Sequence, residues 1–147
     1  MWAFKDKGDR DVCLIPEVTG LIQELYRDSW KNELPKPVKL FYISRCYRYD
    51  RPQLGRYREF TQIGLECLGG KDNRQEVIDI LVGCLNLFNI QYNLVSSVKR
   101  GLAYYLEDGF EVECLKLGAQ KQIAGGGKYE EGIGWAIGLD RLLLAID

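Results

Sequence analysis

Apolar and polar side chains alternate along two stretches in the first half of the chain, on either side of an arginine-rich segment. The apolar side chains fall on odd-numbered positions: Phe41, Ile43, Tyr47 and Tyr49, then Ile63, Leu65 and Cys67. The even-numbered positions carry mostly polar groups: Arg48, Asp50, Arg58, Phe60, Gln62 and Glu66. Because side chains of a strand point alternately to its two faces, the pattern predicts two strands. We expect the odd set in the core and the even set on a polar face.

Other segments show the spacing of helices or of short strands. Apolar residues recur at helical intervals over residues 16–30 (with Pro16 in the first turn), from Asp72 or Asn73 to about Phe88, and over residues 135–146. Shorter apolar runs predict strands at residues 11–15, 92–98, 102–106, 110–117 and 120–124. Successive strands with few helices between them indicate an α+β fold, an antiparallel β-sheet flanked by helices. Residues 1–147 are expected to form a single domain.

Composition narrows the class of protein. The chain has 20 Lys and Arg against 21 Asp and Glu, so no overall positive field draws it to nucleic acid. Five scattered cysteines without a C-x-x-C pair, and no histidine, argue against a zinc site. The polar N-terminus and the lack of an apolar run of ~20 residues predict a cytoplasmic protein without membrane association.

The arginine-rich segment is the main candidate for chemistry. Five arginines lie between Arg45 and Arg58, and the second strand adds Gln62 and Glu66 to the polar face. Isolated arginines on a strand usually form surface ion pairs. A face that combines several arginines with an inward-facing amide and carboxylate is typical of a site for an anion beside a cation, such as a nucleotide and an amino acid.

The stretch from Tyr47 to Glu66, YRYDRPQLGRYREFTQIGLE, resembles motif 2 of the class II aminoacyl-tRNA synthetases. The histidyl-tRNA synthetase version of that motif is F-R-x-E-R-P-Q-x-G-R-Y-R-x-F-x-Q-x-G-x-E. Three further segments resemble this family in the same order: PEVT at 16–19 resembles R-P-E-x-T, RGLAYY at 100–105 resembles R-G-L-D-Y-Y, and GGGKYE at 125–130 with GWAIGLDR at 134–141 resembles G-G-R-Y-D and motif 3. The resemblance covers most of the chain and implies a histidyl-tRNA synthetase catalytic core.

The resemblance implies ATP-dependent activation of histidine to histidyl-adenylate, with possible transfer to tRNA(His). ATP and Mg²⁺ are the implied cofactors, the metal being bound mainly through ATP. Arg48 and Arg100 match catalytic positions, because arginines there hold the α-phosphate and the amino-acid carboxylate together. The matching ATP-binding positions are Arg48, Asp50, Arg56, Phe60 and Arg141.

The same resemblance implies a histidine site. An α-ammonium and an imidazole both need hydrogen-bond acceptors, which carboxylates and hydroxyls supply. The matching positions are Glu17, Thr19, Gln62, Glu66, Arg100, Tyr104, Tyr105 and Tyr129. Arg51 and Gln53, in the motif 2 loop, match positions that contact the tRNA acceptor end. Residue type alone would also allow Glu17 to be an ordinary first-turn helix acid, and Tyr105 and Tyr129 to be core aromatics.

Departures from the family pattern leave other functions open. Ile15 stands where R-P-E-x-T has its arginine, and Ala103 where R-G-L-D-Y-Y has its aspartate. Motif 1 forms the family's dimer interface and has no match here, so a homodimer is an open point. The insertion and anticodon-binding domains also have no match, so tRNA charging is an open point. The alternatives are a non-catalytic histidine-binding paralogue, like the regulatory subunit of ATP phosphoribosyltransferase, and a ligase that loads an amino acid onto a non-tRNA acceptor.

Overall fold

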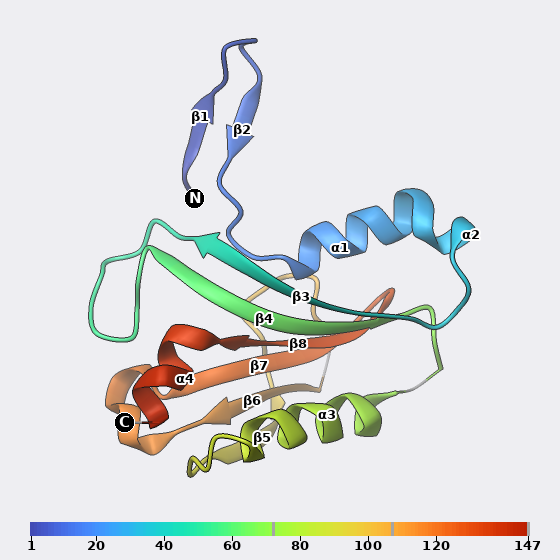
Figure 1. Ribbon diagram of the computed structural model, residues 1–147. Coiled ribbons are helices and arrows are strands. Elements are labelled where there is room, and N and C mark those ends of the chain that lie inside the picture. Colours follow the sequence, from blue (N-terminus) through green and yellow to red (C-terminus); the bar gives the residue numbers. More distant parts are fainter. Residues whose placement is uncertain (72, 107, 147) are drawn as a thin grey trace.

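Six strands form one antiparallel sheet in the computed structural model, which describes residues 1–71, 73–106 and 108–146 (Figure 1). Along the sheet the order of strands is β3-β4-β8-β7-β6-β5. The strands are β3 Val38–Tyr47, β4 Glu59–Leu68, β5 Asn93–Val98, β6 Gly109–Glu113, β7 Gln122–Tyr129 and β8 Gly132–Gly138. The predicted α+β fold with an antiparallel sheet is confirmed, and β4 lies between β3 and β8, inside the sheet.

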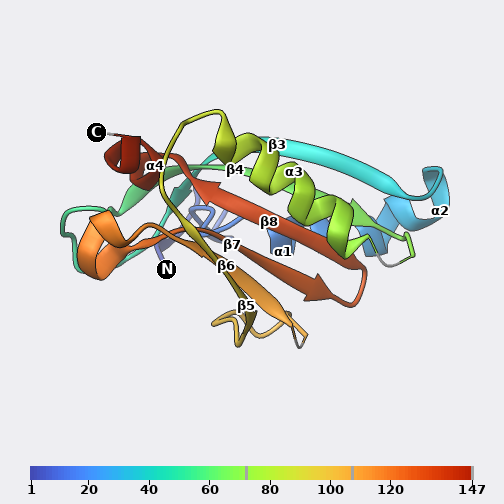
Figure 2. The ribbon, with the colours of Figure 1, turned by 90° about the horizontal axis from the view of Figure 1, so that it is seen from below.

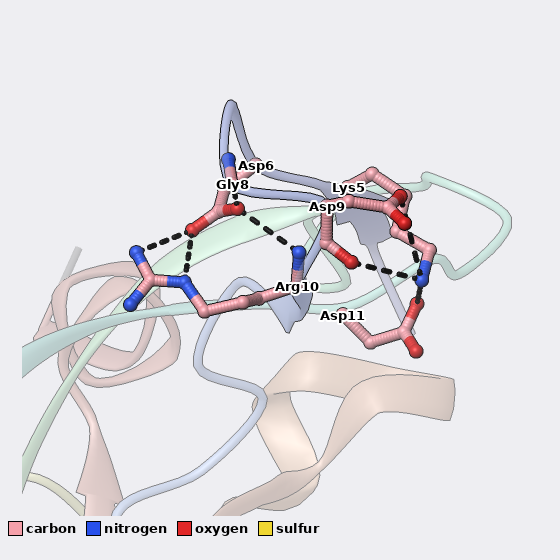
Figure 3. A network of polar contacts seen from close by, with 6 residues as sticks. All are labelled: Lys5, Asp6, Gly8, Asp9, Arg10 and Asp11. Atoms are coloured by element: carbon pink, nitrogen blue, oxygen red, sulfur yellow. Dashed lines mark hydrogen bonds and ion pairs between the residues drawn. The ribbon is translucent and has the colours of Figure 1, made fainter.

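A separate hairpin precedes the sheet and points away from it (Figure 1). Its strands, β1 Ala3–Lys5 and β2 Asp11–Cys13, pair antiparallel. In the loop between them, Oδ1 of Asp6 accepts hydrogen bonds from the backbone N–H groups of Gly8 and Arg10 (Figure 3). The other oxygen of Asp6 lies 2.7 Å from the Arg10 guanidinium. These contacts close the loop without help from the rest of the protein.

Helix α1, Thr19–Leu25, covers one face of the sheet (Figure 1 and Figure 2). It continues into a π-helical segment, Tyr26–Trp30, and a short helix α2, Lys31–Glu33. The buried side chains of Ile22 and Tyr26 pack with Leu68 and Tyr129 of the sheet. The helix predicted over residues 16–30 is therefore confirmed from Thr19 onward, while residues 16–18 precede it.

Helices α3, Arg74–Asn86, and α4, Leu139–Ile146, cover the opposite face (Figure 2). Val77, Leu81 and Leu85 of α3 are buried in the main apolar core, and the indole N–H of Trp135 donates to the Val77 carbonyl at 2.9 Å. The sheet contributes the rest of this core, chiefly Cys67, Phe110, Val112, Ile123, Ile133, Trp135 and Ile137. No helix in the described part of the chain is long and apolar enough to cross a membrane.

The C-terminal elements differ most from the sequence-based prediction. Residues 132–138 form strand β8, so the last helix begins at Leu139 rather than at Trp135. Ile133, Trp135 and Ile137 alternate with small residues, which is the period of a strand. Pairing with β4 on one side and β7 on the other then settles the conformation.

Other predicted boundaries also change. Residues 102–106 form a turn instead of the expected strand. The strand expected at 110–117 ends before residue 115, because residues 115–120 form a 3₁₀ helix. The strand expected at 120–124 runs from 122 to 129, and the one expected at 11–15 ends at Cys13. Asp72, one of two proposed helix caps, lies outside the described residues. The other, Asn73, is the N-cap residue but makes no capping hydrogen bond with its side chain.

The odd-numbered side chains of β3 do not lie in the core. Phe41 is 74% exposed and Ile43 is 63% exposed, whereas their partners on β4, Leu65 and Ile63, pack against the core. Tyr49 is also exposed, at 62%. Because β3 is the edge strand, the face that carries Phe41 and Ile43 extends beyond the buried core. The predicted core set is thus right for β4 and wrong for these three residues.

A leucine on α3 tests the main core. Leu81 is fully buried between α3 and the sheet, so Leu81→Ala should lower the free energy of unfolding by about 2–5 kcal/mol. Leu87, just after α3, is 82% exposed, and Leu87→Ala should change that free energy by less than about 0.5 kcal/mol. Urea denaturation of both variants measures the difference, and equal effects would contradict this placement of α3.

Candidate functional site

A cavity of about 730 Å³ opens on the α1 face of the sheet. Its walls come from β4, β6, β7, β8, α4, residues 16–19, the loop between β3 and β4, and the turn at residues 100–105. The predicted site residues that line it are Glu17, Thr19, Arg48, Asp50, Arg56, Phe60, Gln62, Arg100, Tyr104, Tyr105 and Arg141. Segments far apart in the sequence thus bring most of the predicted residues together in one place.

Four predicted site residues lie outside the lining of this cavity. Glu66 and Tyr129 are fully buried beneath it, between the sheet and α1. Arg51 and Gln53 are exposed in the loop between β3 and β4, where Gln53 pairs with Arg56 in an isolated bridge. The structure therefore separates a cavity, a buried polar group below it, and an exposed loop beside it.

Glu66 is the most buried charged group of the site. The Thr19 hydroxyl donates to its Oε1 and the Tyr129 hydroxyl to its Oε2, each at 2.6 Å. Burial raises the pKa of the Glu66 carboxyl to about 7, although both hydrogen bonds oppose that rise. Gly134 is its partner across the β4–β8 pair, and a Cβ there would overlap the carboxylate. The site thus needs both the hydroxyls and a glycine to hold Glu66 in place.

Glu17 lies just before α1, outside its first turn. Its carboxylate still accepts a hydrogen bond from the backbone N–H of Gly20, at 3.0 Å, near the positive end of the helix. It also accepts from the hydroxyl of Tyr104 at 2.9 Å, inside the cavity. Burial is the main reason that the pKa of Tyr104 is raised, and burial also raises the pKa of Tyr105 to about 12. Both phenols are therefore neutral hydrogen-bonding groups at neutral pH.

Two cavity arginines are held by neutral groups. Arg48 donates through Nε to the Pro16 carbonyl, and its guanidinium lies 4.9 Å from the centre of the Phe60 ring. Arg141 donates to the carbonyl oxygens of Gly55 and Gln122, at 2.5 and 2.8 Å. Within the described ranges, neither guanidinium forms an ion pair with a carboxylate.

Burial lowers the pKa of Arg141, and the positive charges of Arg48 and Arg56 lower it further. Asp50 opposes this effect and is itself paired with Arg56 at 3.3 Å. The positive charges at this end of the cavity are therefore close enough to repel one another, and the acidic groups there only partly offset them.

Two further lining residues, Glu111 and Gln122, and the helix residue Asp140 were not predicted. Glu111 forms an ion pair with Arg100 on the cavity floor. Asp140, in the first turn of α4, accepts a hydrogen bond from the Thr61 N–H at 2.8 Å and fixes α4 against β4. Glu111 could have been found from its sequence, since it alternates with the apolar residues Phe110 and Val112 and so falls on the polar face.

No group of three or more histidine, cysteine, aspartate or glutamate side chains among the described residues is arranged to hold a metal ion. The cysteines do not suggest a metal either. Cys46 and Cys67 are buried, and burial raises the pKa of the Cys46 thiol to about 11. A metal ion in this cavity would therefore need ligands from a bound substrate as well.

Comparison with known proteins gives a family match over most of the chain. The family model described as the tRNA synthetase class II core domain (G, H, P, S and T) matches residues 2–131. The histidine–tRNA ligase of Metallosphaera sedula is 38% identical over 138 residues, which are 80% of this chain and 32% of that protein. The histidine–tRNA ligase of Sulfolobus acidocaldarius is 52% identical over 83 residues, 55% of this chain and 19% of that protein. The chain thus spans a third or less of these relatives.

Solved structures show the same fold at lower sequence identity. Apo histidyl-tRNA synthetase of S. aureus superposes with a TM-score of 0.83 and 21% identity, covering 99% of this chain and 60% of that one. A Bacillus halodurans protein described as an ATP phosphoribosyltransferase regulatory subunit/histidyl-tRNA synthetase gives 0.82 and 14%, covering 99% and 68%. Both likenesses concern the fold.

The raised pKa of Glu66 predicts a pH-dependent stability. Below its ordinary value near 4.5 the carboxyl is neutral in both folded and unfolded chains, and the folded state bears no penalty. As the pH rises through about 7, the unfolded chain gains stability from ionisation before the folded one does. The stability that the neutral carboxyl provides is therefore lost across this window.

Glu66→Gln should not show this loss. The difference in free energy of unfolding between Glu66→Gln and the wild type should shift in favour of the variant between about pH 5 and about pH 8. Urea denaturation at both pH values measures it. Glu76→Gln, which removes an exposed carboxylate paired with Lys39, is the control. A Glu66→Gln difference that stays constant with pH would contradict the placement of Glu66.

Proposed function

Because this chain belongs to the class II aminoacyl-tRNA synthetases, with a core like that of histidyl-tRNA synthetase, we propose that it activates histidine with ATP. The products would be histidyl-adenylate and pyrophosphate. The observation that carries the proposal is the pair Arg48 and Arg141, two cavity cations held by neutral groups. A half-buried guanidinium without an anion is unfavourable, so this end of the cavity favours an anionic ligand.

In the proposed reaction an oxygen of the histidine carboxylate attacks the α-phosphorus of ATP. A P–O bond to the α-phosphate forms, and the bond to the departing pyrophosphate breaks with its electron pair. Both reacting groups, the carboxylate and the α-phosphate, are anionic, so bringing them together requires positive charge beside them. Arg48 and Arg100 both line the cavity and would supply that charge. Their contribution is orientation and electrostatic stabilisation rather than covalent chemistry.

ATP fits the residues present at the arginine-rich end. The Phe60 ring offers an aromatic surface for adenine, and Arg56 and Arg141 line the cavity where phosphates would lie. Mg²⁺, when bound, would neutralise phosphate charge. We propose that it enters with ATP, held mainly by the phosphate oxygens, because the described side chains provide no metal cluster of their own.

Histidine would occupy the end of the cavity near α1. Glu17, Thr19 and Gln62 line it there and would accept the α-ammonium group. Tyr105 lines the same region, whereas Glu66 lies below it with both oxygens hydrogen-bonded. Each oxygen of Glu66 can accept a second hydrogen bond, so an imidazole could reach it once the side chains that cover it move aside. That contact would favour a ring N–H over an apolar side chain as the guest.

Transfer to tRNA is the less supported half of the proposal. Arg51 and Gln53 are exposed beside the cavity, where they could contact an acceptor end. The curated relatives considered above are three to five times longer than the matched region. Charging of tRNA(His), like cytoplasmic location, therefore remains a prediction for this chain.

A histidine-binding protein without activation is the second candidate. Two observations favour it: Ile15 and Ala103 replace charged residues of the family pattern, and both are exposed rather than part of the cavity lining. Such a protein would need the α1 end of the cavity but not the phosphate end. Histidine binding measured by calorimetry, without any pyrophosphate exchange, would support it.

The first measurement is ATP–pyrophosphate exchange with each of the twenty amino acids. Exchange with histidine and with no other amino acid is the expected result, because we propose that an imidazole N–H donates to the buried Glu66. Exchange with a different amino acid would refute the substrate. No exchange with any of them would refute activation.

An arginine just after β3 tests the mechanism. Arg48→Ala should lower the exchange rate by about 10²–10³-fold, because it removes a charge that acts on the reacting phosphate. Arg45→Ala is the matched control, since Arg45 lies three residues earlier on β3, is exposed, and pairs with Glu59 at 3.2 Å. Unchanged exchange in Arg48→Ala, or an equal loss in Arg45→Ala, would refute the role of Arg48.

Homodimerisation also remains a prediction. Phe41 and Ile43 expose large apolar side chains on the edge strand β3, and a second copy is the partner that we propose for this face. Sedimentation equilibrium at micromolar concentration should show a dimer. Phe41→Asp should shift it to monomer, and a wild-type monomer would contradict the proposal.

A further inference from the structure

Arg100 is the most enclosed of the cavity arginines that pair with a carboxylate. Its side chain is 14% exposed, and its guanidinium forms an ion pair with Glu111, whose side chain is 21% exposed. The Tyr105 ring lies on another side of it, with its centre 5.5 Å from the guanidinium carbon. Nε of Arg100 is buried and has no hydrogen-bond partner among the described residues. The Arg100 guanidinium is therefore paired with Glu111 through a terminal nitrogen, while its Nε–H has no acceptor among the described residues.

The sheet has a gap shaped for this guanidinium. Arg100 lies across Gly125 of β7, and a Cβ at that position would overlap both terminal nitrogens. Gly125 is the register partner of Glu111 on β6. The carboxylate thus stands directly beside the gap, on the face of the sheet that lines the cavity.

The ion pair limits where the guanidinium can point. A long arginine side chain has several rotatable bonds and, without a partner, would sample many positions. The carboxylate fixes one end of its planar group in the half-buried gap, where a charge pair is stronger than on the surface. Arg100 also lines the cavity. Arg56 is paired with Asp50 in the same way, but that arginine is 44% exposed and much less confined.

We propose that Glu111 is a positioning residue that fixes the Arg100 guanidinium over Gly125 for histidine activation. This inference rests on the proposed function of the cavity. Glu111 acts through Arg100 and takes no part in bond formation itself. Its charge is the essential feature, because an amide can accept the same hydrogen bond but cannot balance the guanidinium charge.

The test combines exchange kinetics with the substitutions Glu111→Gln and Arg100→Lys. Glu111→Gln alone should lower the maximal exchange rate by about tenfold or more, with the KM for ATP changed by less than about threefold. In the Arg100→Lys background, Glu111→Gln should have little further effect, because the group that Glu111 positions is gone. A full additional loss in that background would overturn the proposal and indicate a direct role, such as contact with a cation carried by ATP.

A second measurement does not depend on activity. The Nε–H signal of Arg100, assigned by its loss in Arg100→Lys, can be followed by NMR in the ligand-free protein. Its proton should exchange with water about tenfold faster in Glu111→Gln than in the wild type. Glu76→Gln, which breaks the exposed pair with Lys39, should leave that rate unchanged.

The two measurements separate failure of the inference from failure of the proposed function. A wild-type protein without exchange activity would refute activation, and the NMR rates would still decide whether Glu111 fixes Arg100. Unchanged Nε–H exchange in Glu111→Gln would overturn the inference even if the protein activates histidine. Loss of the folded spectrum in Glu111→Gln would also overturn it, since Glu111 would then be a stability residue.

Discussion

The alternation of side chains along β4 determines where the core and the chemistry lie. Its odd positions, such as Ile63 and Leu65, face the core beneath α3 and α4, while Gln62 and Glu66 face α1 and the cavity. Because β4 pairs with β3 on one side and β8 on the other, a slip of one residue would exchange these faces. It would bury Glu66 in the apolar core without Thr19 and Tyr129, and so the register that forms the core also forms the site.

Two glycines, which leave space where other residues have a side chain, shape the site as much as its charged residues do. Gly134 leaves the space that the Glu66 carboxylate fills, and Gly125 leaves the space that Arg100 crosses. Both glycines lie on strands that flank a charged residue in the register. Each charge is thus brought against the sheet backbone, where hydroxyls or a carboxylate complete its surroundings. A larger residue at either glycine would push the charged side chain out of its place, although the charge itself would remain.

Sequence patterns were informative where one physical effect dominated. The period of β4 and the apolar stripe of α3 predicted their elements, because each packs on one face against the core. The same reasoning failed for Phe41, since alternation does not reveal that β3 lies at an edge. It failed for residues 135–138, which were expected in the last helix but alternate as a strand and pair on both sides. The motifs identified the cavity lining, but not that Glu66 lies beneath it, because depth depends on how α1 packs.

The charges of the cavity bear on the choice between activation and simple binding. Of its four arginines, Arg56 and Arg100 have carboxylate partners, while Arg48 and Arg141 are held by neutral groups in the described structure. Free histidine brings one carboxylate and one ammonium group, so it has no net negative charge to place beside Arg48 and Arg141. A nucleoside triphosphate would bring several negative charges to the end of the cavity that holds Arg48 and Arg141. The repulsion that lowers the pKa of Arg141 would then become attraction to the ligand. This arrangement favours a cavity for a nucleotide beside histidine over a cavity for histidine alone.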